Sequence, residues 1–145
     1  MIAQVKASAI DGRLGNVFWR QAELQKLYKA LVSQSSSIQN AIQKHSGVTK
    51  TEAKVEFSKA MYVLKQRYVE LNPEIMREEE YLIANGLDAP GARKAFGIAY
   101  IIPTNHTIFY SIVTAIAAAI AAGNCCILEV SHSRGSWLLS STNFD

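Results

Sequence analysis

The sequence has little of what marks several large classes of protein. Its 145 residues include two cysteines, three prolines and eight glycines, and only 19% of the residues are charged. Cys125 and Cys126 are adjacent, so on a strand their side chains point to opposite faces and suit neither a disulfide nor a CxxC zinc or redox site. The first eleven residues lack the apolar core of a secretory signal. We therefore expect a reducing, cytoplasmic location.

The sequence also has little excess of charge of either sign. The net charge of +3 is too small to predict a nucleic-acid partner, although residues 1–70 are basic and residues 71–145 are acidic. The basic residues of the first half have no aromatic or glycine-rich element between them, which is typical of a solvated helix face. The acidic run 78–80 is expected to be an exposed linker, because three consecutive side chains cannot converge on one ion. We predict no metal site.

Apolar residues make up 49% of the chain, and in the first half their spacing predicts a pair of helices. They recur at intervals of three, four and seven over residues 24–42, and Gly47 follows as a helix stop. Thr49 and Glu52 form a capping box, in which each side chain satisfies a free amide of the other residue. A second helix should therefore begin here and end before Pro73.

No charged residue occurs between Ala95 and Leu128, and this segment predicts a strand, a helix and a second strand. Residues 97–102 are apolar without alternation, as in a strand covered on both faces. Residues 108–122 are apolar almost all round and end at Gly123, which predicts a buried helix. Residues 125–128 resume as a strand. The segment is thus one βαβ unit, and its functional edge is the carboxyl end of the first strand.

That edge is the loop 103–107, which carries Asn105. Free amides at the start of the following helix favour a phosphate or a developing oxyanion, and the Asn105 side chain offers another donor. The alternative is that Asn105 or Thr107 only caps the helix. His106 lacks an identified catalytic partner, which favours a surface role. Neither glycine-rich fingerprint of nucleotide sites is present.

Besides a soluble enzyme, two other classes of protein stay open as interpretations. Residues 107–128 are long enough for one membrane span, and Arg93 and Lys94 lie on the correct flank for a positive-inside orientation. The alanine-rich composition and the pair Gly123 and Asn124 inside the span make this a minor alternative. The other alternative is a non-catalytic interaction module.

Two segments at a fixed spacing resemble the aldehyde dehydrogenase superfamily. Residues 97–106 read GIAYIIPTNH and residues 117–128 read AAAIAAGNCCIL. In that family a Gly-Val-Val strand leads into Pro-Trp-Asn, and Ala-Ile-Ala-Ala-Gly-Asn leads into the next strand. Residues 12–13 and 19–21 are similar to the family's opening helix, and residues 46–48 to its first interhelical loop. The resemblance covers about residues 8–129.

The resemblance implies a site for an aldehyde and a nicotinamide cofactor. Asn105 falls on the asparagine that donates to the substrate carbonyl oxygen. Ile102, Pro103 and Thr104 would lie along the cofactor. Glu129 falls where the family usually has a lysine that binds the adenosine ribose, and its charge disfavours a ribose phosphate, so we expect NAD rather than NADP. Thr104 and Thr107 replace the family's tryptophan and proline.

The resemblance also sets the expected fold class, which is α/β. A helical hairpin in residues 1–86 is followed in 87–129 by the first βαβ unit of an incomplete doubly wound, Rossmann-like cofactor domain, and 130–145 is expected to be a divergent, disordered tail. The family's catalytic cysteine and glutamate motifs are not found, and Cys125 and Cys126 fall inside a strand. We therefore interpret the chain as an N-terminal fragment that is inactive alone and self-associates through its uncovered strands.

Overall fold

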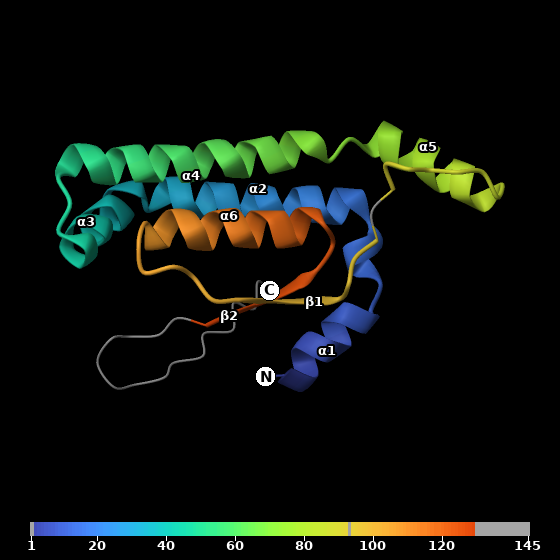
Figure 1. The fold of residues 1–145 in the computed structure, drawn as a ribbon, viewed down its shortest axis with the longest axis horizontal. Coiled ribbons are helices and arrows are strands. Elements are labelled where there is room, and N and C mark those ends of the chain that lie inside the picture. The colour runs from blue at the N-terminus through green and yellow to red at the C-terminus, as the bar shows by residue number, and fades with distance from the viewer. Residues whose placement is uncertain (1, 93, 130–145) are drawn as a thin grey trace.

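The computed structural model describes residues 2–92 and 94–129. In Figure 1, three long helices lie side by side above a two-stranded sheet, and a short N-terminal helix lies on the other side of that sheet. The elements in chain order are α1 (Ile2–Ile10), the 3-10 helix η1 (Arg13–Gly15), α2 (Val17–Ser33), α3 (Ser35–Ser46), α4 (Lys50–Glu70), α5 (Pro73–Ala84), β1 (Ile98–Ile101), α6 (Ile108–Ala121) and β2 (Cys125–Leu128).

The first predicted helix of the hairpin is in fact two helices. The apolar stripe over residues 24–42 runs through α2 and α3, which meet at Gln34 with a non-helical backbone (φ −106°, ψ 15°). Serines surround this break, and serine side chains compete for backbone hydrogen bonds and so weaken a helix interior. Because α1 and α5 are helical as well, the prediction of a simple hairpin is wrong for this part of the chain.

The predicted junction between the stripe and the next helix is confirmed. Gly47 ends α3 in the left-handed conformation, with φ 66°. The Thr49 amide donates to Glu52 Oε2 at 2.8 Å and the Glu52 amide donates to Thr49 Oγ1 at 3.3 Å, which is the capping box at the start of α4. The glycine stop and the capping box together fix where α4 begins, without any contribution from its packing.

Residues 78–80 lie inside α5, so the prediction of an exposed linker there is wrong. α4 ends before Pro73, as predicted. Pro73 is the first residue of α5, where the missing backbone amide of proline costs no hydrogen bond. The Asn72 side chain caps this helix by accepting from the Glu74 amide at 2.9 Å. Glutamate is a good helix former, which allows an exposed acidic run to be helical.

The predicted βαβ unit is confirmed. β1 and β2 pair in parallel, with Ile98 opposite Cys125 and Ile101 opposite Leu128, and α6 connects them. The helix ends as the sequence indicates, because Gly123 has φ 79° and the Asn124 amide donates to Ala119 O at 2.8 Å. The chain is thereby returned to the sheet directly after its helix.

β1 is not covered on both faces by the described residues, contrary to the sequence prediction. Its burial alternates: Ile101 is buried, whereas Ile98 and Tyr100 are exposed, and Ile102 beyond the strand is exposed as well. Residues 97, 99 and 101 share one face of the strand, and 98 and 100 share the other. α6 packs against this sheet, while the side chains of Ile98 and Tyr100 remain in contact with solvent.

One hydrophobic core joins the helical segment to the βαβ unit. Leu24 of α2 and Leu64 of α4 are almost completely buried, and they belong to the same cluster as Val113 and Ala117 of α6. The cluster therefore crosses the sequence division at residue 86. The predicted single membrane helix over residues 107–128 is not formed, because this segment folds as a helix, a turn and a strand. Among the described residues, no helix has the length and apolar character needed to cross a membrane.

Arg20 of α2 is buried and holds the carboxyl-terminal end of α6. Its Nη1 donates to Ala121 O at 2.9 Å, and its Nη2 donates to Gly15 O at 3.2 Å and lies 3.5 Å from Met76 Sδ. Burial lowers the pKa of the Arg20 guanidinium, and the negative charge of Glu80 opposes this shift. A positive charge at this end of a helix is favourable because the helix dipole is negative there.

We expect Arg20→Ala to lower the free energy of unfolding by about 2–3 kcal/mol, because two carbonyl groups lose a charged donor. Arg13→Ala is the matched control, since Arg13 is exposed and forms an ion pair with exposed Asp11; its loss should cost less than about 1 kcal/mol. Urea denaturation followed by circular dichroism measures both. Equal losses in the two variants would contradict the role of Arg20.

Candidate active-site loop between β1 and α6

The loop 102–107 connects β1 to α6 and carries the residues that the sequence singled out. Ile102, Thr104, Asn105 and His106 are exposed, and Pro103 is half-buried. Two hydrogen bonds hold the loop, one to α6 and one within the loop. The Thr104 amide donates to Ser111 Oγ at 3.2 Å, and the Thr104 hydroxyl donates to the carbonyl of His106 at 2.6 Å.

Neither polar loop residue caps α6. Thr107 is the residue before the helix, but it has a left-handed backbone (φ 47°, ψ 52°) and its side chain makes no capping hydrogen bond. The Asn105 side chain forms no hydrogen bond with another described residue. The interpretation of these two residues as mere helix caps is therefore wrong, and the Asn105 side chain is exposed among the described residues.

A carboxylate from another helix takes the capping position instead. Glu56 of α4 accepts a hydrogen bond from the Tyr110 amide at 3.1 Å, and only 9% of the residue is exposed. The negative charge suits the positive end of the α6 dipole. It also opposes a second anion there, so this helix terminus is poorly suited to a phosphate.

Sequence analysis did not single out Glu56, although a signal for it was present. The residue lies on the buried side of α4, between Ala53 and Ala60 of the apolar stripe. A carboxylate at such a position must find a donor in the interior, because an unpaired buried charge is very costly. The sequence could not show which amide that donor would be.

Glu129 lies beside Tyr100 at the carboxyl edge of the sheet. Its amide donates to Ile101 O at 2.9 Å, which continues the strand pairing by one bond. The Tyr100 hydroxyl donates to Glu129 Oε2, and this hydrogen bond raises the pKa of Tyr100, with smaller contributions from burial and from the carboxylate charge. Ile102 and Glu129 each follow the last paired residue of their strand, so the structure places these two predicted cofactor residues at the same edge.

The two cysteines are held in β2 as poorly reactive thiols. Cys125 is paired with Ile98 and Cys126 with Ala99, so the two side chains lie on opposite faces of the sheet. Burial raises the pKa of Cys125. Burial and, to a lesser extent, the neighbouring Cys125 raise the pKa of Cys126 to about 11. Because the thiolate is the nucleophile, neither side chain is suited to attack a carbonyl group.

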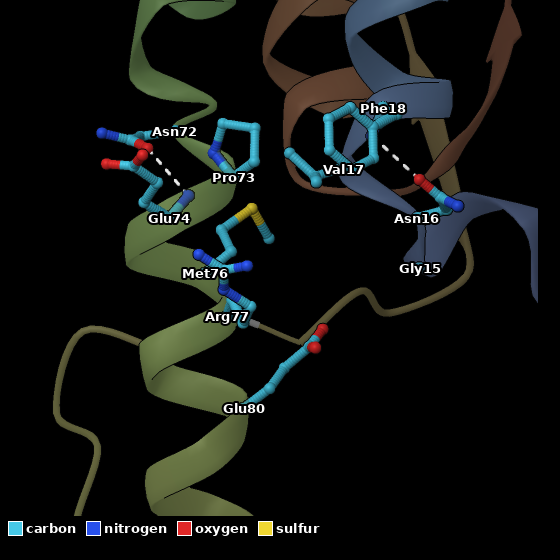
Figure 2. Close-up of a pocket in the computed structure, with 10 residues that line it drawn as sticks. All are labelled: Gly15, Asn16, Val17, Phe18, Asn72, Pro73, Glu74, Met76, Arg77 and Glu80. Carbon is cyan, nitrogen blue, oxygen red and sulfur yellow. Dashed lines mark hydrogen bonds between the residues drawn. The ribbon is translucent and has the colours of Figure 1, made fainter.

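A cavity of about 730 Å³ elsewhere in the molecule does not involve the predicted site. It lies between the amino-terminal ends of α2 and α5, and Figure 2 shows the two asparagines at its margin engaged in capping. Asn16 accepts from the Phe18 amide and Asn72 from the Glu74 amide, both at 2.9 Å. The described residues contain no group of three or more side chains that could hold a metal ion.

The segment that holds β1, the loop, α6 and β2 falls within a match to a known protein family. The model of the aldehyde dehydrogenase family matches residues 13–137. The chain therefore belongs to the aldehyde dehydrogenase family, a family of oxidoreductases. The match includes the whole βαβ unit and continues beyond Glu129, where the resemblance seen in the sequence ends. A search of curated proteins finds no individual protein that matches the chain.

We expect Cys126 to react slowly with N-ethylmaleimide. At pH 7 a thiol with a pKa of about 11 has roughly a hundredfold less thiolate than an ordinary cysteine, and the rate should keep rising with pH toward 11. The Cys125→Ala variant isolates Cys126, and the same variant unfolded in urea provides the reference rate. A folded rate at pH 7 equal to the unfolded rate would contradict the assignment.

Proposed function

We propose that this chain supplies the leading helices and the first βαβ unit of the cofactor domain of an NAD-dependent aldehyde dehydrogenase. Membership of the family and the parallel pairing of β1 and β2 support the assignment. In such an enzyme a doubly wound, Rossmann-like sheet binds the cofactor at the carboxyl ends of its strands. The reaction would oxidise an aldehyde to a carboxylic acid. The two free cysteines support a reducing, cytoplasmic location.

The observation that carries the proposal is the exposed side chain of Asn105 at this edge, which forms no hydrogen bond within the described part of the chain. Its amide would donate a hydrogen bond to the aldehyde oxygen, where negative charge develops during attack by a thiolate. The backbone amide of Tyr110 is already used by Glu56, and the exposed Asn105 side chain offers a further donor at the start of α6. A neutral donor suits this task because it needs no change of protonation.

The residues of the sheet edge fit an NAD cofactor. Ile102 and Thr104 are exposed and Pro103 is half-buried, so they can line the cofactor with apolar contacts and one polar side chain. The Glu129 carboxylate can accept hydrogen bonds from the ribose hydroxyl groups, as acidic residues do in other dinucleotide folds. NAD supplies the hydride acceptor of the reaction; these residues would bind and orient it.

Glu129 would also determine the choice between NAD and NADP. A ribose phosphate next to this carboxylate would be repelled, and the Tyr100 hydroxyl that pairs with Glu129 keeps the carboxylate at the sheet edge. The preference for NAD therefore depends on the charge of one residue. Tyr100 contributes by holding that charge in place.

We expect NAD to bind the 15N-labelled chain and shift the amide signals of Ile102, Thr104 and Glu129. NADP should bind at least about tenfold more weakly, because repulsion between like charges near a surface exceeds the ~1.4 kcal/mol that a tenfold change in Kd requires. Glu129→Gln should reduce this difference, whereas Glu70→Gln, at an exposed position on α4, should leave it unchanged. If NAD shifts no signal of the loop or of Glu129, the proposed cofactor site is wrong.

We expect the purified 145-residue chain not to reduce NAD when an aldehyde is added. Cys125 and Cys126 are its only cysteines, and both are held as thiols in β2. Absorbance of NADH at saturating NAD, with a short and a long aliphatic aldehyde, measures the rate. Turnover that disappears in the Cys125→Ala or Cys126→Ala variant would show that a strand cysteine is the nucleophile, contrary to this prediction.

A further inference from the structure

Glu56 links the helical segment to the start of α6 across the core. The residue lies on α4, 54 positions before Tyr110, and its Oε1 accepts from the Tyr110 amide at 3.1 Å. Beside this contact, the rings of Phe57 and Phe109 stack with their centroids 5.6 Å apart and an interplanar angle of 12°. The carboxylate and the stacked rings together fix the first turn of α6 against α4.

The surroundings of Glu56 leave it partly accessible to water. It lines a cavity of about 530 Å³ together with Thr107 and Tyr110 of the α6 end. The charged groups on its own helix that line the same cavity are Glu52 and Lys59, and the only titratable side chain of α6 that lines it is Tyr110.

The first turn of α6, which Glu56 caps, is in turn hydrogen-bonded to the loop. Tyr110 is followed by Ser111, whose hydroxyl oxygen accepts from the Thr104 amide at 3.2 Å. Thr104 in turn donates through its hydroxyl to the carbonyl of His106 at 2.6 Å. Asn105 lies between these last two residues. The position of its backbone is therefore set by the first turn of α6.

α6 also lacks the local device that normally fixes a helix start. Thr107 has a positive φ of 47° and makes no side-chain cap. A non-glycine residue in this conformation persists only where surrounding contacts impose it. In the described part of the chain, the cap that satisfies an amide of the first turn comes from Glu56.

We propose that Glu56 is a positioning residue for the reaction: by capping α6 from α4, it fixes the loop that presents Asn105. This inference rests on the proposed role of Asn105 as the donor to the aldehyde oxygen. Glu56 itself contacts neither substrate nor cofactor. It acts through the Tyr110 amide and the bond between Ser111 and Thr104.

The test compares three variants by amide hydrogen exchange in the 145-residue chain. Glu56→Ala should speed exchange at the Tyr110 amide at least about tenfold, with little change at Ala117 in the centre of α6. Glu56→Gln keeps an oxygen acceptor and should restore most of the protection. Glu70→Ala, an exposed position on the same helix, is the control and should change neither amide.

A second measurement follows the loop itself. In Glu56→Ala the amide signals of Thr104 and Asn105 should shift, and the Kd for NAD should rise at least about threefold; Glu56→Gln should recover both. Ser111→Ala should move the Thr104 signal while leaving the Tyr110 amide protected, because it removes the hydrogen bond from the Thr104 amide to Ser111 Oγ.

The outcomes separate this inference from the proposed function. Equal exchange at Tyr110 in Glu56→Ala and Glu70→Ala, or an equal rise at Ala117, would overturn the positioning role. So would unchanged Thr104 and Asn105 signals in Glu56→Ala. Failure of NAD to bind the unmodified chain would defeat the proposed cofactor site, while the exchange and loop-signal results would still decide whether Glu56 fixes the loop.

Discussion

The arrangement depends on a helix that is held at both ends by charges from other helices. α6 receives the Glu56 carboxylate at its first turn and the Arg20 guanidinium at its last. Each charge has the sign that the helix dipole favours at that end. Because α6 connects the two strands, this pair of contacts fixes the whole βαβ unit against α2 and α4. The loop and the sheet edge take their positions from it.

These contacts place two charged side chains in the interior, where an uncompensated charge would be very unfavourable. Arg20 is 5% exposed and makes bonds to two carbonyl groups, yet its Nε has no partner among the described residues. Its donors serve the end of α6 and the end of η1 at the same time. The cost of burial is thus offset by satisfying acceptors that would otherwise be buried without donors.

Local signals in the sequence were sufficient for much of the fold. The capping box at Thr49, the glycine stops at Gly47 and Gly123 and the apolar segments around α6 each depend on neighbouring residues only, and the structure confirms them. The break at Gln34 was missed because the apolar period continues across it. The α5 helix was missed because its charged face conceals the helical pattern.

The position of the candidate site residues was predictable, and their electrostatic surroundings were less so. A strand followed by a polar loop and a helix indicates the edge at which a site is expected, and Asn105, Ile102 and Glu129 lie at that edge. The cap from Glu56 and the pairing of Tyr100 with Glu129 join residues far apart in the sequence. No local pattern specifies such partners, because they depend on how helices and strands pack.

The turn at Gly123 has a wider consequence for how this unit can be used or altered. A Cβ atom on this residue would lie 2.9 Å from the carbonyl oxygen of Leu14, in addition to the strain imposed by its positive φ. The N-terminal segment therefore closes directly over the turn between α6 and β2. The βαβ unit could therefore not be moved to another protein by itself. Its end is in direct contact with residues more than a hundred positions earlier in the chain.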